Sequence, residues 1–477
     1  MNQTSIFDIM YPKYKITKPI RLIECFAGYG SQALALKYLG VQFEHWKICE
    51  WAVKSIQAYK DIHFGNDNTD YSKDYSIQDI IGQLYFYGIS SNYNESMTLE
   101  QIKRLSETQQ RKIFNNIKAT HNLVNIQTTH AIDLEIVDTD KYDYIMTYSF
   151  PCQDLSLAGK GKGMSDTSTR SGLLWEVERI LTECHELGTM PQVLLMENVP
   201  QVHSLDNMPD FHKWQVRLEE LGYKSYWQDL IATDYGIPQT RNRCFMVSIL
   251  GDYSYTFPKP IPLKLKLKDM LEENVDEKYY LSDKMIDFFM QNEEKQKENG
   301  NGFRFNVSDG NVIAKTITTR AGGRMDDNFI KEPKVLGGFG KIGSTNQYHL
   351  QNRVYEGDTA ITIATCCNPY YKVETIGNYS PSNHNASRIV DSEYSAPTVM
   401  ENHGTITATQ TSDLRIRKLT PKECFRLMGV KDEDFDKVKK NQSDSSLYHL
   451  AGDSIVVNVL EAIIKELLWH KKSYIIF

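Results

Sequence analysis

The feature that most constrains the fold of this chain is a strand, a glycine turn and a helix that follow one another directly near its beginning. Residues 20–40, IRLIECFAGYGSQALALKYLG, open with a short apolar run that favours a β-strand. Gly28 and Gly30 then permit a tight turn, and apolar residues at helical spacing continue as far as Gly40. A helix joined to a strand by so short a turn packs back onto the sheet. We therefore expect this segment to begin an α/β domain.

The same alternation recurs along the chain. VQFEHWKICEWAVKSIQAY predicts a strand and a helix, YDYIMTYSF a strand, LLWEVERILTECHELG a helix and PQVLLMENV a buried strand. Alternating strands and helices predict a mostly parallel sheet with helices on both faces. The predicted fold class is therefore α/β.

The length, composition and net charge exclude several classes of protein. The chain has 477 residues, of which 41% are hydrophobic and 24% charged, as in ordinary globular proteins. The first residues lack the apolar core of a signal peptide, and no uninterrupted apolar run approaches the length that spans a bilayer. We expect a soluble protein of the cell interior. A net charge of -7 gives no overall attraction for nucleic acid, so a nucleic-acid role requires a local basic cleft.

The eight cysteines show no metal-binding or disulfide pattern. They contain no CxxC pair, and no HExxH motif accompanies them. We expect no bound metal, and any reactive cysteine should act as a single thiolate.

Two segments interrupt the α/β pattern. Residues 66–130 are polar and predict a helical insertion, which includes MTLEQIKRLSETQQRKIFNNI with Thr98 and Gln101 as a capping box. Residues 256–415 are rich in Gly, Thr and Asn and predict a β-rich domain. Within it RFNVSDGNVIAKTITT, RVYEGDTAITIAT and RIVDSEYSAPTVM form a weak repeat, which predicts repeated hairpins.

Helices return after residue 416. In KLTPKECFRLMGV, Thr420 is a suitable N-cap, Pro421 suits the first helical position and Glu423 completes a capping box. AGDSIVVNVLEAIIKELLWHKK predicts one final amphipathic helix. The chain thus divides into 1–255, a β-rich domain at 256–415 and a closing part of the first domain at 416–477.

Side chains that can take part in binding or catalysis follow the predicted strands. The carboxyl ends of parallel strands meet at one edge of a sheet, where ligands bind. Glu50 and Trp51, Cys152 in PCQ, and Glu197 in ENV each come directly after a strand. A carboxylate after the second strand suits ribose hydroxyls, and a desolvated carboxyl such as that of Glu197 can be protonated near neutral pH. Each of these residues taken alone also fits a purely structural role.

A further group precedes the strand in IPQTRNRCFMVSI. Gln239, Arg241 and Arg243 occupy alternate positions, so in extended backbone they face one side. That arrangement presents an amide and two guanidinium groups together, although a salt-bridged strand edge would have the same pattern.

Seven blocks in fixed order carry a resemblance to a known family. FAGYG, EW, PCQ, ENV, QTRNR, RKLTPKECFRLMG and GDSIVVNVL resemble the conserved blocks of the DNA (cytosine-5) methyltransferase family, bacterial or phage type. The blocks fall within residues 20–60, 131–250 and 416–460. The resemblance implies a Rossmann-like domain that depends on S-adenosylmethionine. Residues 256–415 would then be a target-recognition domain, inserted before the C-terminal helices.

The resemblance also implies which residues bind the cofactor. Phe26, Gly28 and Gly30 would line its adenine and methionine portions, Glu50 would hold the ribose and Trp51 one face of the adenine. Asp133 in HAIDL and Leu173 in RSGLLWE match further cofactor contacts. Asp453 and Ser454 match the last block, where GNS is commoner than the GDS found here, so Asp453 adds a carboxylate near the cofactor.

The same resemblance implies the catalytic residues. Cys152 would add to carbon 6 of cytosine, with Glu197 at ring nitrogen 3 and the amino group and Arg243 at the carbonyl oxygen. Gln239 and Arg241 would orient the site. The target base must leave the helix to be reached, and the glycine-containing loop after Cys152 would close on it.

The implied substrate is double-stranded DNA at a specific sequence, methylated by a monomer in the cytoplasm of a bacterial or phage-infected cell, with no membrane contact. A cognate restriction endonuclease of a restriction-modification pair need not bind it. Three alternatives stay open: a cytosine-5 methyltransferase acting on transfer RNA, a catalytically silent DNA-binding protein, and a NAD-dependent oxidoreductase, although the GxGxxG fingerprint of the last is absent.

Overall fold

The computed structural model describes residues 11–151, 171–333, 335–338, 353–356, 370–372, 375–378, 388–390 and 414–468. The chain divides into two compact units. The first comprises Met1–Leu265, Ile313–Arg320 and Cys424–Phe477. The second comprises Lys266–Val312 and Ala321–Glu423.

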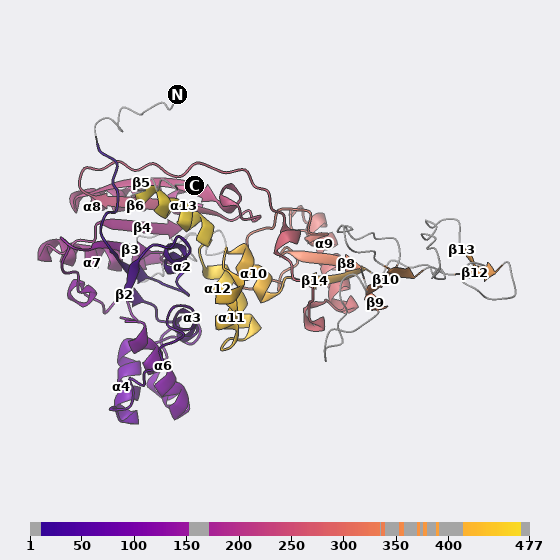
Figure 1. The fold of residues 1–477 in the computed structure, drawn as a ribbon, viewed down its shortest axis with the longest axis horizontal. Coiled ribbons are helices and arrows are strands. Elements are labelled where there is room, and N and C mark those ends of the chain that lie inside the picture. The colour runs from indigo at the N-terminus through magenta and orange to yellow at the C-terminus, as the bar shows by residue number, and fades with distance from the viewer. Residues whose placement is uncertain are drawn as a thin grey trace, which may run out of the picture. The chain divides into compact units, whose positions relative to one another are not determined.

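A six-stranded sheet forms the centre of the first unit (Figure 1). Its strands are β1 (Ile20–Cys25), β2 (Phe43–Cys49), β3 (Asp143–Tyr148), β4 (Val193–Asn198), β5 (Tyr223–Ile231) and β6 (Asn242–Leu250). They lie in the order β2-β1-β3-β4-β6-β5. The first four are parallel, and β6 runs antiparallel to both β4 and β5. The mostly parallel sheet predicted from the sequence is confirmed.

Alternate residues of β1 show that both faces of this sheet are covered. Ile23 and Cys25 belong to a core cluster with apolar residues of α7 (Leu174–Leu187) and α8 (Met208–Glu220). Glu24 points the other way, where it bonds the backbone of α2 (Ser31–Tyr38) and a side chain of α3 (Val53–His63). The strands are buried on both faces, which explains why their sequences are apolar runs rather than alternating patterns.

The predicted insertion is helical and contains more than one helix. It contains α4 (Ile77–Tyr87), α5 (Leu99–Lys103) and α6 (Glu107–Ala119), which pack on one another around a separate apolar cluster (Figure 1). The predicted capping box of Thr98 and Gln101 is present. A second capping box, formed by Ser106 and Gln109, starts α6.

The chain ends in α10 (Pro421–Leu427), α11 (Asp432–Lys439), α12 (Asp444–Asp453) and α13 (Val457–Leu467). The single helix predicted from Ala451 onward is wrong, because the backbone is extended at Ser454 and α13 begins only at Val457. Within the described residues one stretch, Asp444–Leu467, passes a length-and-composition test for a membrane span, yet 72% of its apolar window is buried inside the protein. Since α12 and α13 divide that stretch and α13 packs on α2, we assign it to the core.

The second unit contains α9 (Asp283–Glu298) and short strands. β7 (Val307–Ser308), β8 (Phe329–Pro333) and β14 (Leu414–Lys418) form one sheet around an apolar cluster that includes Phe289, Met325 and Phe329. β9 (Val335–Gly338), β10 (Arg353–Glu356) and β11 (Tyr370–Lys372) form another, and β12 (Thr375–Asn378) pairs with β13 (Arg388–Val390). The first of the three predicted repeats, residues 304–319, is described and is not a hairpin, because its one strand, β7, pairs in parallel with β8. Most of the other two repeats lies outside the described residues.

A buried ion pair in this unit explains the KLTPKE sequence. Arg417 is bonded to both carboxylate oxygens of Glu423 at 2.9 and 3.0 Å, and both side chains are fully buried. Glu423 also accepts the backbone N–H of Thr420, whose hydroxyl accepts the N–H of Glu423. The predicted capping box of α10 is therefore confirmed.

Candidate active site

The register of the parallel strands brings the predicted motifs to one edge of the sheet. Cys25 at the end of β1 is paired with Cys49 of β2 and with Tyr148 of β3, and Tyr148 is paired with Met196 of β4. The residues after these positions leave the sheet together at its carboxyl edge. Cys152 lies outside the described residues.

Asn198 ties two of the motifs together at this edge. Its side-chain amide donates to the carbonyl of Phe150 at 3.0 Å, and its own oxygen accepts the N–H of Val199. The asparagine of ENV therefore fixes the end of β4 against the backbone that leads into PCQ.

Glu197 and Arg243 form a largely buried ion pair. Arg243 Nε lies 3.1 Å from Glu197 Oε1, and only about a tenth of the Glu197 side chain is exposed. Burial raises the pKa of Glu197, and the charges of Arg243 and Arg241 offset only part of that effect. The Glu197 carboxyl therefore keeps its proton to a higher pH than a solvated carboxyl, and the protonated form can donate a hydrogen bond.

Arg241 and Gln239 bond to backbone from distant parts of the first unit. Arg241 donates to the carbonyls of Ile317, Gly452 and Ser454 at 3.2, 3.0 and 2.6 Å. Burial, followed by repulsion from Arg243, lowers the pKa of Arg241 to about 9.

Gln239 is fully buried. It donates to the carbonyl of Leu427 and accepts the N–H of Ile317, both at 2.8 Å. Gln239 and Arg241 therefore hold the neighbouring segments in place. Of the three residues predicted to act together, Arg243 is the one that faces Glu197.

Glu50 links the glycine loop to the start of α3. Its oxygens accept the N–H of Gly28 at 2.9 Å and that of Ala52 at 2.8 Å. Burial raises its pKa to about 7. Each carboxylate oxygen can accept a second hydrogen bond, so the group can hold the loop and still receive hydroxyl groups of a ligand.

A cavity opens next to the glycine loop. It collects four of the predicted cofactor residues: Phe26, Gly28, Asp453 and Ser454. It is also lined by residues that the sequence interpretation did not single out, among them Tyr29, Ser55, Tyr93 and His449. Of these, His449 had a readable signal, because it precedes Asp453 by one helical turn; Tyr93 lies in the insertion and had none.

The remaining predicted cofactor residues lie beside this cavity or apart from it. Gly30 has φ +82°, and a Cβ there would overlap His63 and Tyr59, so the turn requires glycine. Trp51 packs against the apolar cluster of the insertion, and Leu173 packs against the main core. Asp133 accepts the N–H of His130 and so caps its own short helix, Ala131–Leu134.

These features suit the binding of a nucleotide-like ligand with a polar tail. The close-packed turn at Gly30 keeps side chains away from the loop, Glu50 offers acceptors for hydroxyl groups, and Asp453 offers a negative charge for a cation. The chemistry of these donors and acceptors fits S-adenosylmethionine, which carries a ribose, an ammonium and a carboxylate.

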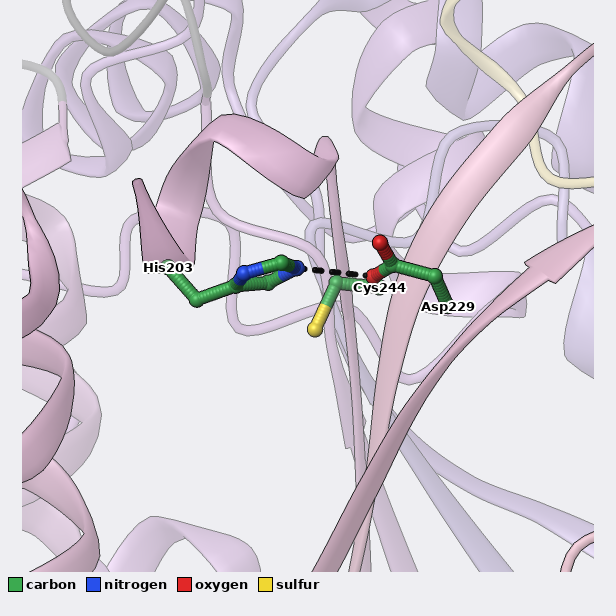
Figure 2. Close-up of side chains that lie close together, drawn as sticks. All are labelled: His203, Asp229 and Cys244. Atoms are coloured by element: carbon green, nitrogen blue, oxygen red, sulfur yellow. Dashed lines mark hydrogen bonds and ion pairs between the residues drawn. The ribbon is translucent and has the colours of Figure 1, made fainter. Parts of the chain in front are cut away.

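A second polar cluster lies on the opposite face of the sheet. Figure 2 shows His203, Asp229 and Cys244, whose ligand-type atoms lie within 4.8 Å of one another. Cys244 pairs with Asp229 across β5 and β6, one residue away from Arg243 and so on the other face. The sequence spacing of single His, Asp and Cys residues did not predict this grouping.

Its geometry is that of a hydrogen-bonded cluster. His203 Nε2 is 2.9 Å from Asp229 Oδ1, which is a direct hydrogen bond. Burial and the charge of Asp229 raise the pKa of the Cys244 thiol, which favours the protonated form that does not ligate metals.

The sheet, with a glycine loop and a buried acid at its carboxyl edge, defines an α/β protein of the nucleotide-binding class. The family model of C-5 cytosine-specific DNA methylases matches residues 95–469. The type II methyltransferase M2.ScrFI of Lactococcus lactis subsp. cremoris is 30% identical over 450 residues, which cover 94% of this chain and 99% of that protein. The chain belongs to the C-5 cytosine-specific DNA methylase family and is a DNA (cytosine-5) methyltransferase.

Other relatives include solitary enzymes. The orphan methyltransferase M.SssI of Spiroplasma monobiae is 34% identical over 60% of this chain and 73% of its own length. The orphan methyltransferase M.SPRI of Bacillus phage SPR is 28% identical over 67% of this chain and 81% of its own.

Solved structures agree on the fold. The Entamoeba histolytica methyltransferase EhMeth covers 94% of this chain and 98% of its own, with a TM-score of 0.53 and 12% identity. The Dnmt2 methyltransferase of S. pombe has the same coverage, with a TM-score of 0.52 and 14% identity. At such identity these two structures support the methyltransferase fold alone.

Proposed function

We propose that the protein uses S-adenosylmethionine to methylate carbon 5 of cytosine at a specific sequence in double-stranded DNA, through a covalent adduct of Cys152. The observation that carries this proposal is the Glu197–Arg243 pair, which lies at the edge of the sheet where Asn198 holds the backbone leading to Cys152. A purely binding protein would not need a desolvated acid and a guanidinium group at that point.

The chemistry explains why those residue types are needed. Addition of the Cys152 thiolate to carbon 6 moves electrons into the ring and makes carbon 5 nucleophilic. S-adenosylmethionine supplies the electrophilic methyl group. Loss of the carbon-5 proton and release of the thiolate then restore the aromatic ring.

Glu197 and Arg243 stabilise the charge that addition of the thiolate creates. A raised pKa keeps the Glu197 carboxyl protonated to higher pH, so that it donates to ring nitrogen 3. Arg243 donates to the carbonyl oxygen, where negative charge also develops. Binding of the base must therefore replace part of the ion pair between the two side chains with bonds to cytosine.

The residues beside the cavity would hold the cofactor. Glu50 receives the ribose hydroxyls and Trp51 contacts the adenine, with Asp133 and Leu173 on that side. Phe26, Gly28 and Gly30 line the adenine and methionine portions of the cofactor, with Asp453 and Ser454 nearby. Gln239 and Arg241 act as positioning residues, because both hold the segments from which Leu427, Gly452 and Ser454 come.

DNA recognition would belong mainly to the target-recognition domain predicted at residues 256–415, most of which falls within the second unit. Reading base edges needs a surface separate from the catalytic pocket. We propose that the enzyme acts as a monomer in the cytoplasm of a bacterial or phage-infected cell, without a bound endonuclease. Its relatives include both type II and orphan methyltransferases, so either setting is compatible with it.

Adduct formation tests the mechanism. The purified protein is incubated with S-adenosylmethionine and duplex DNA containing 5-fluorocytosine, which blocks release of the enzyme. We expect a denaturation-resistant complex from the wild type and none from Cys152→Ala, which should still bind the cofactor. Methyl transfer by Cys152→Ala would contradict the mechanism.

The substrate and its target are tested together. Labelled cofactor is offered with duplex DNA and, separately, with transfer RNA, and we expect label only in DNA. Sequencing the methylated cytosines in DNA from cells that express the protein should reveal one recurrent sequence. Labelling of transfer RNA alone would replace the DNA assignment, and methylation without sequence preference would contradict the role of the second unit.

A further inference from the structure

We propose that the insertion at residues 66–130 is part of the cofactor pocket, and that its Tyr93 positions Asp453 through His449. This inference rests on the proposed function, because it names a further determinant of cofactor binding. Tyr93 lies in the turn between α4 and α5 and lines the cavity together with Gly28 and Asp453. It is the residue through which the insertion reaches that cavity.

Tyr93 acts on the pocket through the imidazole of His449, which lies against its ring at a tilt. Its ring centroid is 3.9 Å from that of His449, with an angle of 31° between the planes. His449 Nε2 in turn lies 2.9 Å from Asp453 Oδ2, one helical turn further along α12. The Tyr93 ring restricts the rotamers of His449. His449 Nε2 makes no well-aligned hydrogen bond to a described residue, so it acts on the Asp453 carboxylate by its close approach.

The turn that carries Tyr93 is built at a conformational cost. Tyr93 has φ +65°, a left-handed conformation that residues with side chains seldom adopt. Ser90 Oγ stabilises it by accepting the N–H of Tyr93 at 3.1 Å and donating to the carbonyl of Glu95 at 2.7 Å. A strained conformation that is supported in this way often marks a functional position.

The same turn is anchored to the strand end that carries Glu50. The N–H of Ser90 donates to the carbonyl of Trp51 at 2.8 Å, and the N–H of Val53 donates to the carbonyl of Ser90 at 2.9 Å. The insertion is thus joined by backbone hydrogen bonds to the segment expected to hold the ribose. Tyr93 and Glu50 are therefore positioned as one unit.

The Tyr93 hydroxyl is available to a ligand. It is buried near Ser55 and makes no well-aligned hydrogen bond to another described residue. Burial raises the pKa of the hydroxyl, with smaller contributions from Glu50 and Asp453, and Asp453 lines the same cavity as Tyr93. The hydroxyl can donate to the amino-acid portion of the cofactor, while Asp453 accepts from the ammonium group.

Cofactor affinity measured without DNA tests this proposal. Isothermal titration with S-adenosylmethionine compares the wild type with Tyr93→Ala, Tyr93→Phe and the matched control Phe86→Ala, whose ring lies in the same insertion but is 75% exposed. We expect the Kd to rise about tenfold for Tyr93→Ala and about threefold for Tyr93→Phe, with no change for the control. In methylation assays, KM for the cofactor should rise in parallel, while kcat stays within about twofold.

Coupling to His449 separates positioning from general loss of structure. His449→Ala should weaken binding, and in that background Tyr93→Ala should cost no more than Tyr93→Phe, because the ring acts through His449 and only the contribution of the hydroxyl remains. Independent, multiplying effects would overturn the proposed route, and wild-type affinity in Tyr93→Ala would overturn the role of the insertion. If the wild type itself did not bind S-adenosylmethionine, the proposed function would fail first, so the two failures are distinguishable.

Discussion

Glu197 of β4 and Arg243 of β6 face each other across neighbouring antiparallel strands, with Arg243 Nε 3.1 Å from Glu197 Oε1. The pair explains how an acid can be buried at the edge of the sheet and still be poised to exchange a proton. Burial favours the neutral carboxyl and the guanidinium favours the carboxylate, and burial has the larger effect.

Replacing Arg243 should therefore change both the rate and its dependence on pH. Arg243→Ala removes a charge that lowers the pKa of Glu197, so that pKa should rise further and the alkaline limb of the pH–rate profile should move to higher pH. The loss of a donor to the carbonyl oxygen should slow single-turnover methyl transfer on the order of 10²-fold to 10³-fold. Arg243→Lys keeps the charge, so its rate and its pH–rate profile should lie between those of the wild type and Arg243→Ala. An unshifted profile in Arg243→Ala would exclude a role of the ion pair in catalysis.

Arg241 should matter for stability more than its place in a catalytic motif suggests. Arg241→Ala leaves the carbonyls of Ile317, Gly452 and Ser454 without these donors, at about 1–3 kcal/mol for each buried group that water does not reach. Part of this loss is offset, because the variant no longer has to bury a charged guanidinium group. We expect the free energy of unfolding to fall by about 3 kcal/mol in urea titrations, with weaker cofactor binding.

Arg217 provides the matched control for Arg241. It bonds Glu178 at 2.6 Å, but 31% of its side chain is exposed, so Arg217→Ala should cost less than about 1 kcal/mol. Equal losses from the two substitutions would refute a structural role for the Arg241 network.

Local sequence signals predicted local structure well. The strand, turn and helix at residues 20–40 and the capping boxes at Thr98 and Thr420 are present, because each depends on contacts within a few residues. The alternation of strands and helices also predicted the parallel part of the sheet.

Long-range contacts set the limits of prediction. The partners of Arg241 lie 76 to 213 residues away, so nothing in QTRNR shows which carbonyls it holds. The break between α12 and α13 was missed for the same reason, because Arg241 binds the carbonyls of Gly452 and Ser454 there. Tyr93 reaches the pocket only through the packing of the insertion.

Gly452 should not tolerate a side chain. It lies in α12, where a Cβ would overlap the backbone of Thr318 and Thr319. Gly452→Ala must therefore displace one of these segments, and with it the following Asp453 and Ser454. We expect a loss of about 2 kcal/mol or more in unfolding free energy and at least tenfold weaker cofactor binding by titration.

Gly82 serves as the control for a glycine in a helix. It lies in α4, where a Cβ would meet nothing within 4 Å. Gly82→Ala should raise the unfolding free energy by up to about 1 kcal/mol, because alanine favours the helix, and should leave cofactor binding unchanged. A similar response of both glycine variants would refute the close approach at Gly452.

Glu24 should make the stability of the fold depend on pH. It is fully buried on the face of the sheet that α2 and α3 cover, where Tyr59 donates to one carboxylate oxygen at 2.6 Å and the N–H of Ala33 to the other at 3.3 Å. Burial nevertheless raises its pKa from 4.5 to about 7. His45, which contacts the Tyr59 hydroxyl, has a pKa lowered to about 4 by burial and stays neutral in this range.

The folded protein therefore binds a proton at Glu24 that the unfolded chain releases between about pH 4.5 and pH 7. The stabilisation is fully present below the unfolded pKa and is lost as the pH rises through the folded pKa, by an amount on the order of 3 kcal/mol. Glu24→Gln keeps the shape of the side chain but has no group that titrates. The unfolding free energy of this variant should therefore rise relative to that of the wild type as the pH increases from about 5 to about 8. Urea unfolding at several pH values measures this difference, and parallel curves for the two proteins would show that Glu24 does not titrate in this window.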